Sequence, residues 1–530
     1  MMRSRTCRSA RVRDITTHVD VMRWRQLSSH SFHPIVREFT EKLAKKQPAF
    51  AVSAERISVL SEPSEFYSLL LSMIERAQKR IFISSLYIGS EESALVDALR
   101  KALYTHPQLK VYLQLDLNRS TRPGPSSTAR ILVPLLKAHP NRVHVSMFRS
   151  PHLRGVMAKV VPPRFNEGWG TWHAKIYGAD DEVVISGANL NKSYFTNRQD
   201  RYLHFANQPG LAQYCFEFLR TVSHFSFHLL PASSEKGRLG PHSCEGEHYT
   251  LAWSDPETHP HHIHDKARHA FSSFQAASRS ASSLVTEDAA PSQGTLDHGK
   301  VLLFPVIQAG QFDIREEEWS LQLLFRHLQK MTPQMSRPLV DLTSGYFGLY
   351  ETYRDLIRQS SNVDCRIVAA SPKANGFYGS SGLSGRIPEG YTLLEQRFMK
   401  SIVEAGRNWI ETDTGRCVGV QLSEWEKPGW TYHAKGIWLA PTHTSRPVLT
   451  LFGSTNLNSR SAHIDTELSF FMVIPSEDKA TTESSGVVNL QDRLAGELLH
   501  IRENATPWKG ARRIVRFWTK ALVKVVQNML

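Results

Sequence analysis

A motif that occurs twice is the feature that most constrains what this 530-residue chain folds into. The first copy reads Thr171-Trp172-His173-Ala174-Lys175, and the second reads Thr431-Tyr432-His433-Ala434-Lys435. Each copy is followed by an apolar run and then by a small-residue turn that contains an asparagine, Asn189 or Asn456. An acid follows each asparagine 11 positions later, as Asp200 or Glu467. Repetition in this detail predicts two copies of one structural unit.

The residues before each motif indicate the secondary structure of the two units. Apolar residues recur at helical spacing over residues 66–77, and a β-rich run follows over residues 80–88. In the second half, residues 319–328 have a helical pattern and residues 339–347 have the character of a strand. The order of helix and strand is therefore the same in both halves.

Matched landmarks place the two halves in the same register. Tyr87 precedes His173 by 86 positions, and Tyr346 precedes His433 by 87. We therefore expect an α/β fold with two pseudo-symmetric lobes that share one active site. Each lobe is expected to be a mixed β-sheet flanked by helices, the first over residues 51–230 and the second over residues 301–505.

Residues 231–300 separate the two halves and differ from them in composition. They are rich in Ser, His, Pro and Gly, with seven histidines from His242 to His269. Because so few apolar residues cannot repay the entropy of ordering, we expect a disordered insert here. The histidines and Cys244 could also form a metal cluster, but they lack regular ligand spacing.

The two ends of the chain carry targeting and surface signals. Seven arginines and only two acids occur in the first 30 residues, so residues 1–50 are expected to hold a mitochondrial presequence, with a basic binding tail as the alternative. Residues 506–530 are expected to form a basic amphipathic helix, which could lie on an anionic membrane or pack on the core. Its apolar face consists of Ile514, Phe517, Trp518, Ala521, Leu522, Val525 and Met529.

The composition of the chain limits which binding partners and which cellular compartment are expected for this protein. The net charge of +14 favours an anionic partner, which could be nucleic acid, an acidic membrane or a phosphorylated substrate. The five cysteines form no CxxC pair, so neither a zinc site nor a disulfide framework is expected. No apolar run approaches the roughly 18–20 residues that cross a bilayer, so we expect a soluble or peripheral protein.

The paired motifs predict phosphodiester chemistry. In an extended strand, residues i and i+2 point to the same face, so His173 projects together with Lys175, and His433 projects together with Lys435. Two such faces would surround one phosphate, with the lysines balancing its charge without a metal ion. One imidazole would attack phosphorus while the other transfers protons. Asp200 and Glu467 would hydrogen-bond the imidazoles, supported by Asn189 and Asn456.

These residues resemble the phospholipase D superfamily, whose signature is His-x-Lys-x4-Asp followed by a Gly/Ser-x-Asn turn. The first copy keeps the aspartate as Asp180, whereas Ala440 takes its place in the second copy. The resemblance spans roughly residues 55–500 apart from the insert, and it implies phospholipase-D-like lobes. It also implies a phosphohistidine intermediate and a catalytic set of His173, Lys175, Asp180, His433 and Lys435.

Two further strings, residues 186–202 and 374–385, are similar to one family within that superfamily, the eukaryotic phosphatidylglycerophosphate synthases. The resemblance implies transfer of a phosphatidyl group from CDP-diacylglycerol to glycerol 3-phosphate, with no cofactor and no metal. It implies a mitochondrial protein peripheral to the anionic inner membrane, with no nucleic-acid partner. Candidate substrate-binding residues are Gly376, Tyr378, Gly379 and Arg198, and Arg119, Arg122 or Arg201 could also grip the acceptor phosphate.

Four alternatives use the same sequence evidence. A phospholipase D-type hydrolase or a cardiolipin synthase would use the same residues with a different acceptor. A nucleic-acid phosphodiesterase would explain the positive charge, but it would be expected to interleave basic and aromatic residues along a groove, and the sequence has no clear stretch of that kind. A non-enzymatic scaffold would be expected to lose a histidine or a lysine from one motif, and both motifs are intact.

Overall fold

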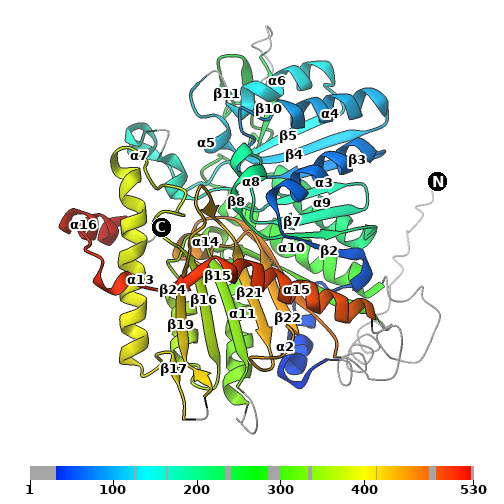
Figure 1. Ribbon diagram of the computed structural model, residues 1–530. Coiled ribbons are helices and arrows are strands. Elements are labelled where there is room, and N and C mark those ends of the chain that lie inside the picture. The colour runs from blue at the N-terminus through cyan, green and yellow to red at the C-terminus, as the bar shows by residue number, and fades with distance from the viewer. Residues whose placement is uncertain are drawn as a thin grey trace, which may run out of the picture.

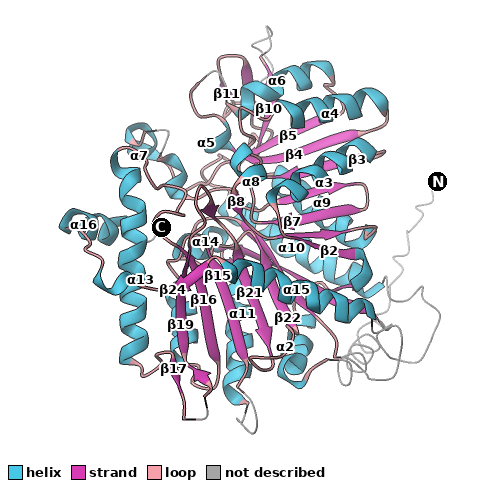
Figure 2. Cartoon of the chain, in the orientation of Figure 1, coloured by secondary structure: helices cyan, strands magenta, loops and turns pink. Residues whose placement is uncertain are grey.

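Two large β-sheets, each covered by helices, form the two lobes of the computed structural model (Figures 1 and 2). The structure describes residues 32–124, 127–162, 165–232, 240–284, 299–331, 337–413, 415–476 and 485–526. Residues 1–31, which hold most of the expected presequence, lie outside this set, and so does Met529. The architecture confirms the predicted α/β class with two lobes.

The sheet of the first lobe has the strand order β11-β12-β10-β5-β4-β3-β6-β7-β9-β2. Its strands are β2 (Ile57–Leu60), β3 (Arg80–Ser84), β4 (Lys110–Asp116), β5 (Val143–Phe148), β6 (Ile176–Ala179), β7 (Glu182–Ser186), β9 (Tyr202–Phe205), β10 (Phe227–Pro231), β11 (Cys244–Glu245) and β12 (Tyr249–Ala252). Its helices are α3 (Pro63–Arg76), α4 (Ser93–Thr105), α5 (Leu117–Ser120), α6 (Thr128–Ala138), α7 (Gly155–Val160), α8 (Lys192–Thr196), α9 (Pro209–Ser223) and α10 (His264–Leu284).

Helix α3 illustrates how local sequence builds this lobe. Pro63 stands at its start, where a missing N–H costs nothing, and Glu62 and Glu65 form a capping box. Its buried residues recur at helical spacing, and Phe66 packs on Tyr177 of β6. The pattern over residues 66–77 therefore predicted the buried face of a helix that covers the sheet.

The sheet of the second lobe has the order β1-β13-β23-β22-β21-β15-β16-β19-β24, with β14 paired to β13. Its strands are β1 (Phe50–Ser53), β13 (Lys300–Ala309), β14 (Ile314–Arg315), β15 (Leu339–Ser344), β16 (Asp364–Ala370), β19 (Val420–Trp425), β21 (Lys435–Ala440), β22 (Leu449–Gly453), β23 (Glu467–Val473) and β24 (Ala505–Pro507). Its helices are α2 (Pro34–Ala44), α11 (Glu316–Lys330), α12 (Glu351–Gln359), α13 (Ile387–Glu404), α14 (Ser459–His463), α15 (Ser485–Glu503) and α16 (Phe517–Val526).

The two sheets share one topology at their centres. In the first lobe the order β4-β3-β6-β7-β9 has β3 parallel to β4 and antiparallel to β6. In the second lobe β16-β15-β21-β22-β23 repeats this pattern, with β15 parallel to β16 and antiparallel to β21. In both lobes the strand pair that carries the motif lysine and the small-residue turn is therefore central to its sheet.

The N-terminal segment contributes to the second lobe, which differs from the expected division of the chain. Strand β1 pairs with β13 although the expected first lobe begins at residue 51. Helix α2 buries Phe39 and Leu43 in the apolar core of the second sheet. The sequence did not predict this packing. It depends on contacts with strands that lie more than 200 positions further along the chain.

Residues 231–300 differ from the expected disordered insert where the structure describes them. Strand β12 pairs with β10 and extends the first sheet, and helix α10 packs beside α9. Phe271 of α10 is buried against Phe225 and Phe312. The composition argument was wrong for residues 240–284 because a few well-spaced aromatic residues suffice when a neighbouring core accepts them. Residues 233–239 and 285–298 lie outside the described chain.

The C-terminal segment also differs from the single helix that we expected over residues 506–530. Residues 505–507 form β24 on the edge of the second sheet, and the helix α16 begins only at Phe517. Helix α16 packs on α13 through Val515 just before it and Val523 within it, which are both buried with Leu393. The predicted apolar face is on the other side, where Trp518 is 81% exposed.

Candidate active site

Each motif histidine lies where the two lobes meet, held by backbone bonds to the opposite lobe. The His173 N–H donates to the Thr466 carbonyl (2.9 Å), and the Thr466 N–H donates back to Thr171 (3.0 Å). In the second copy the His433 N–H donates to the Gln199 carbonyl (2.8 Å), where β20 (Thr431–Tyr432) pairs with β8 (Arg198–Gln199). The strand that leads to each histidine thus pairs with the strand that leads to the other lobe's acid.

The two acids are exchanged between the lobes. Nδ1 of His173 lies 2.9 Å from the carboxylate of Glu467, and Nδ1 of His433 lies 2.7 Å from Oδ2 of Asp200. A carboxylate on Nδ1 holds the proton there and leaves the lone pair on Nε2. All four side chains are buried. The sequence predicted that the acids would hold the imidazoles, but only the structure shows which acid holds which ring.

The acids differ in strength because their surroundings differ. Glu467 also accepts hydrogen bonds from Ser454 and from Ser461 (2.6 Å). Burial alone would raise the pKa of Glu467, but His173, Lys175 and Ser454 lower it to about 2. Burial raises the pKa of Asp200 above its ordinary value, although Lys435 opposes this. Glu467 is therefore the more firmly ionised partner.

The two lysines line the same space. Lys175 Nζ donates to the His173 carbonyl (2.6 Å), and Lys435 Nζ donates to the His433 carbonyl (2.7 Å). Burial lowers the pKa of Lys175 to about 7 and that of Lys435 to about 8. The charge of Lys435 also lowers the pKa of Lys175. An anion between these ammonium groups would reverse both shifts, so the site is suited to a phosphate.

The two histidines are also electrostatically coupled. Burial lowers the pKa of His433 well below its ordinary value, and Lys435, Arg198, Lys175 and His173 lower it further. The pKa of His173 is lowered by burial, while Glu467 opposes that change. The charge on His173 therefore acts on His433, so the two imidazoles titrate as neighbours.

Tyr194 breaks the symmetry of the site. It follows Asn189 by five positions, and its hydroxyl lies 3.1 Å from the Asn189 amide and 3.4 Å from Nε2 of His433. Ser461 holds the matching place after Asn456 and bonds to Glu467 instead. The side chain oxygen of Asn456 has no hydrogen-bond partner among the described residues. The sequence analysis missed Tyr194, although its spacing from the motif asparagine could have indicated it.

Two of the predicted substrate-binding residues lie beside the histidines. The guanidinium of Arg198 stacks on the Tyr194 ring (4.3 Å), and its Nε donates to Thr431 Oγ1 (2.9 Å). A Cβ at Gly376 would lie 3.0 Å from the Tyr346 hydroxyl, and the Tyr346 ring lies 5.4 Å from the His433 ring. The glycine therefore permits a close approach of its loop to the site.

The other two predicted binding residues lie farther along the same loop. The side chain of Tyr378 is exposed to solvent. Gly379 has φ +72°, a backbone conformation that glycine adopts without strain. Both positions lie on the outer part of the loop that Gly376 brings to Tyr346.

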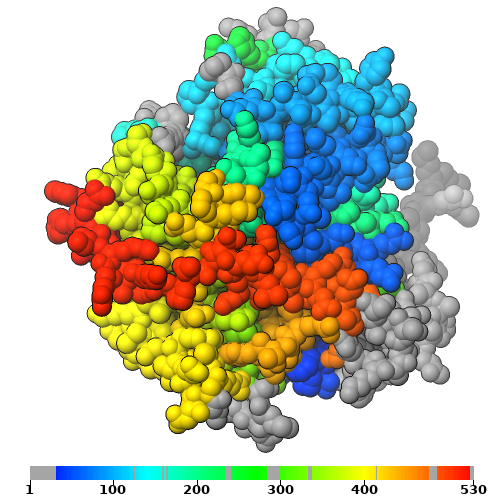
Figure 3. All heavy atoms as spheres, viewed as in Figure 1, coloured from blue at the N-terminus to red at the C-terminus, as the bar shows by residue number. Residues whose placement is uncertain are grey.

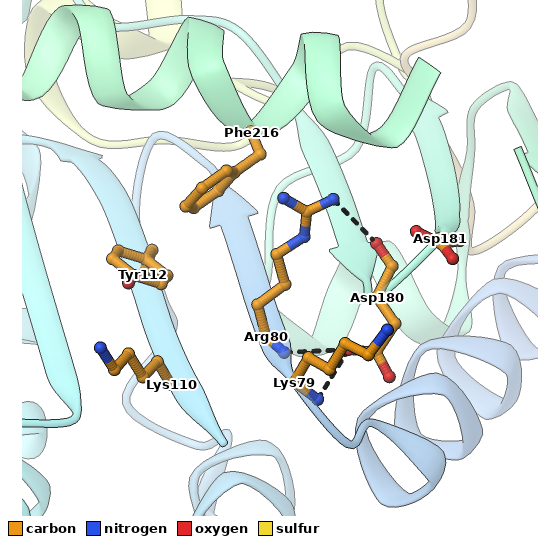
Figure 4. A pocket seen from close by; sticks show the side chains of 7 residues that line it. All are labelled: Lys79, Arg80, Lys110, Tyr112, Asp180, Asp181 and Phe216. Atoms are coloured by element: carbon orange, nitrogen blue, oxygen red, sulfur yellow. Dashed lines mark hydrogen bonds between the residues drawn. The ribbon is translucent and has the colours of Figure 1, made fainter. Parts of the chain in front are cut away.

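Asp180 does not join the catalytic residues, which corrects its predicted place among them. It lies five residues beyond Lys175 at the far end of β6, roughly 16 Å along an extended strand. Its carboxylate accepts the backbone N–H groups of Gln78 (2.7 Å), Lys79 (2.8 Å) and Arg80 (2.9 Å). Figure 4 shows it beside a cavity of about 340 Å³ between the starts of β3 and β4. Its role is to hold the turn that begins β3.

Arg201 is also not a phosphate ligand, because it is buried in an ion pair between the lobes. Its guanidinium bonds to both carboxylate oxygens of Glu497 (2.8 Å each) and lies 3.8 Å from the Trp438 ring. A further bond joins it to the Leu451 carbonyl (2.9 Å). The residue therefore fastens β9 of the first lobe to β22 and α15.

A second group of charged residues lies near His173, and the sequence analysis found only its two arginines from the first lobe. Arg119 and Arg122, both predicted candidates, pair with Glu167 of the short helix η2 (Asn166–Trp169). Arg460 pairs with Asp465 (2.8 Å), and it also donates to the Thr171 hydroxyl (3.3 Å). Glu167, Arg460 and Asp465 carried no signal in the repeat, since Arg198 and Ser193 stand where Asp465 and Arg460 have their counterparts.

His173, Asp465 and Glu467 place potential metal-ligand atoms within 4.8 Å of one another. Their oxygen atoms are already engaged, however. Asp465 accepts from the N–H of Thr171 (2.8 Å) and from Arg460, and Glu467 accepts from two serines and His173. A cation would have to displace an arginine and several hydrogen bonds, so these residues are arranged to hold His173 rather than a metal.

Gly187 leaves room for the catalytic groups, and its replacement tests the fit of the site. A Cβ at this position would lie 2.7 Å from Lys435 Nζ and 2.5 Å from Asp200 Oδ1. We expect Gly187→Ala to lower kcat about 100-fold by displacing both groups. Steady-state kinetics and thermal melting would be measured together. Gly210→Ala is the control, because its Cβ meets only a distant ring edge (3.7 Å). Equal kcat values for the two variants would contradict the prediction.

Comparisons with known proteins identify the family to which this chain belongs. No family model matches the chain. The CDP-diacylglycerol–glycerol-3-phosphate 3-phosphatidyltransferase of Schizosaccharomyces pombe is 33% identical over 513 residues, covering 91% of this chain and 96% of that protein. The mitochondrial protein of the same name from Homo sapiens is 33% identical over 498 residues, covering 91% of this chain and 84% of that protein.

A solved structure supports the fold. The crystal structure of phosphatidylserine synthase from Haemophilus influenzae matches 93% of this chain and 99% of its own chain, with a TM-score of 0.63 and 17% sequence identity. At that identity the match shows the fold alone. The sequence relatives, which align over nine tenths of the chain, decide the family. They confirm the resemblance noted from the motifs, and the chain belongs to the CDP-diacylglycerol–glycerol-3-phosphate 3-phosphatidyltransferase family.

Proposed function

We propose that this protein transfers a phosphatidyl group from CDP-diacylglycerol to glycerol 3-phosphate and releases CMP. The observation that carries the proposal is the exchange of acids between the lobes, which holds two neutral imidazoles and two lysines around one space. Membership of the transferase family supports the choice of substrates. The catalytic residues are His173, Lys175, His433 and Lys435.

In the first step, Nε2 of His173 attacks the phosphorus nearer the diacylglycerol, and the bond to CMP breaks. The phosphatidyl-imidazole that forms carries positive charge, and the firmly ionised Glu467 on Nδ1 stabilises it. Lys435 Nζ lies 2.7 Å from Nδ1 of His433, so a covalent phosphatidyl-imidazole at His433 would hold its charge directly beside an ammonium group. CMP leaves as a phosphate monoester whose second pKa is near ~6, so it needs little protonation.

In the second step, Nε2 of His433 removes the proton from the primary hydroxyl of glycerol 3-phosphate. The resulting oxygen attacks the phosphatidyl-histidine, and His173 leaves with its electron pair restored. The low pKa of His433 keeps this imidazole neutral before the step, and it lets the ring pass the accepted proton on to water afterwards. The Tyr194 hydroxyl lies 3.4 Å from Nε2 of His433, so it can form a hydrogen bond with an acceptor hydroxyl that binds to Nε2 and can orient that hydroxyl.

The proposed setting is the surface of the mitochondrial inner membrane. The human relative is named as mitochondrial, and the Arg-rich N-terminus has the composition of a presequence. None of the described helices has the length and apolar character needed to span a bilayer. The proposed partners are the two substrates and an anionic lipid surface, with no nucleic acid.

One assay tests the reaction. Purified protein is incubated with CDP-diacylglycerol in detergent micelles with EDTA present, and CMP is measured with and without glycerol 3-phosphate. We expect CMP release beyond one equivalent per active site to require the acceptor, and we expect it not to respond to the chelator. Equal release in water alone would identify a hydrolase, and release dependent on phosphatidylglycerol would identify a cardiolipin synthase.

The lysine pKa values predict an alkaline limit on the reaction. Because burial lowers the pKa of Lys175 to about 7 and of Lys435 to about 8, the empty site loses positive charge as the pH rises through these values. We expect kcat/KM for CDP-diacylglycerol to fall above about pH 8, since this ratio reports the free enzyme. The value of kcat should hold to higher pH because the bound phosphate raises both pKa values. A kcat/KM that is flat to about pH 9.5 would contradict the prediction.

A further inference from the structure

Exposed apolar side chains gather on three separate segments of the described chain. Ten of its fifteen exposed large apolar side chains lie on these segments. The segments are α7 with the described residues that follow it, the loop before α13, and α16 with the three residues before it. They carry respectively Val156, Met157, Val160 and Phe165; Tyr378 and Leu383; and Ile514, Phe517, Trp518 and Val525. Such a concentration is unusual for a surface that faces only water.

Two of these segments adjoin through α13. The loop before α13 runs through the short helix η4 (Gly382–Arg386) directly into its first turn. Helix α16 packs on the same end, where Glu389 accepts from the N–H of Arg516 (2.5 Å) and from its guanidinium (3.0 Å). In Figures 1 and 3, α16 and α13 lie together along one edge of the molecule.

The third segment reaches the same place through Arg460. This arginine interacts electrostatically with Glu167 of η2 and with Tyr391 of α13. Glu167 lies two residues after Phe165, the last exposed apolar residue of the α7 segment. In the view of Figure 1 the α7 segment projects next to the first turns of α13, and Gly170 at the end of η2 lies against the carbonyl of Ile464, four residues after Arg460. The three segments therefore form one apolar rim.

Two segments of the rim continue inward toward the histidines. From the α7 segment, Glu167 of η2 is paired with Arg122, and its charge interacts with that of His173. From the loop before α13, Gly376 lies against Tyr346, whose ring centroid is 5.4 Å from that of His433. Both segments thus connect exposed apolar side chains with residues beside the two histidines.

The charge of the rim indicates what covers it. Arg512, Lys520 and Lys524 are exposed around the apolar side chains of the C-terminal segment. Exposed Trp and Phe next to Lys and Arg is the arrangement of a helix that lies in the interface of an anionic bilayer. A surface that binds another protein would be expected to contain fewer lysines, because lysine is depleted in protein–protein interfaces.

We propose that α7 with Val161, Pro162 and Phe165, residues 376–386 and α16 form one surface that docks on an anionic bilayer, and that the donor lipid enters between η2 and α13. This inference rests on the proposed function, because it assigns the entry route of its lipid substrate. It goes beyond a single membrane-binding helix, since α7 and the loop before α13 are required to deliver the lipid to His173 and His433.

The test compares vesicles with micelles. Phe517→Ser/Trp518→Ser alters α16, Val156→Ser/Val160→Ser alters α7, and Leu499→Ser is the control because Leu499 is equally exposed on α15. Flotation is measured with vesicles of phosphatidylcholine alone and with added phosphatidylglycerol. Activity is measured on CDP-diacylglycerol in those vesicles and, in a dispersed short-chain form, in detergent micelles.

We expect the α16 pair to lower vesicle binding about tenfold or more, with the largest loss on anionic vesicles. Both pairs should lower the ratio of vesicle activity to micelle activity about tenfold, whereas the Leu499 variant should keep that ratio. Unchanged ratios in both pairs, or an equal loss in the control, would overturn the proposal. Two measurements separate this proposal from the proposed function. Flotation of a His173→Ala variant reports docking without catalysis, and the micellar reaction of the unaltered protein reports the function. Normal flotation together with no micellar reaction would overturn the function and leave the docking surface in place.

Discussion

Replacing His173 by alanine is expected to abolish CMP release and to lower kcat roughly 1,000-fold or more, because no nucleophile remains to form the covalent intermediate. Replacing His433 by alanine is expected to be nearly as damaging to turnover. The two variants should nevertheless fail at different steps. Without His433 the acceptor alcohol lacks its base, but the first step still releases CMP.

A rapid-quench experiment with labelled CDP-diacylglycerol separates these steps. The His433→Ala variant should release close to one equivalent of CMP per active site and then stop, whereas His173→Ala should release none. The exposed His248 provides a control, since His248→Ala should keep full turnover. A burst that survives in His173→Ala and vanishes in His433→Ala would reverse the two roles.

Breaking the Arg201–Glu497 ion pair is expected to destabilise the protein strongly. Both side chains are buried at the junction of the lobes, and Glu497 also accepts from the Trp438 indole (3.2 Å). Removing the carboxylate leaves the guanidinium buried without its partner, which costs about 3–5 kcal/mol. We therefore expect Glu497→Ala to lower the free energy of unfolding by about 3–5 kcal/mol.

Urea denaturation followed by circular dichroism measures this loss. Glu503→Ala on the same helix is the matched control, because that carboxylate is exposed and lies 3.6 Å from Nδ1 of His500. We expect a change of less than about 1 kcal/mol in the control. A comparably small change in Glu497→Ala would show that the junction tolerates an unpaired arginine and would contradict the account of lobe packing.

The local pattern of the chain was sufficient to predict several elements. The helical spacing of Phe66, Leu70 and Met73 predicted the buried face of α3, and residues 339–347 contain β15. The repeated motif predicted the shared topology of the two sheets. These inferences succeeded because they depend on residues within one or two turns of chain, or on a pattern that the chain itself repeats.

The disordered insert and the catalytic role of Asp180 were wrong for a common reason. Composition alone cannot reveal that Phe271 meets a core already built by Phe225 and Phe312. A motif position cannot reveal that the Asp180 carboxylate turns away from the lysine to hold residues 78–80. In both cases residues far apart in the chain determine the outcome.

The sequence by itself determined that there are two lobes and that each supplies a histidine, a lysine, an asparagine and an acid. Only the tertiary structure decided that Glu467 holds His173 and Asp200 holds His433. The physical reason is that each motif strand pairs with the strand before the opposite acid, a contact between residues more than 230 positions apart. Spacing along the chain specifies the residues of a site, whereas the docking of two sheets specifies which of them share a proton.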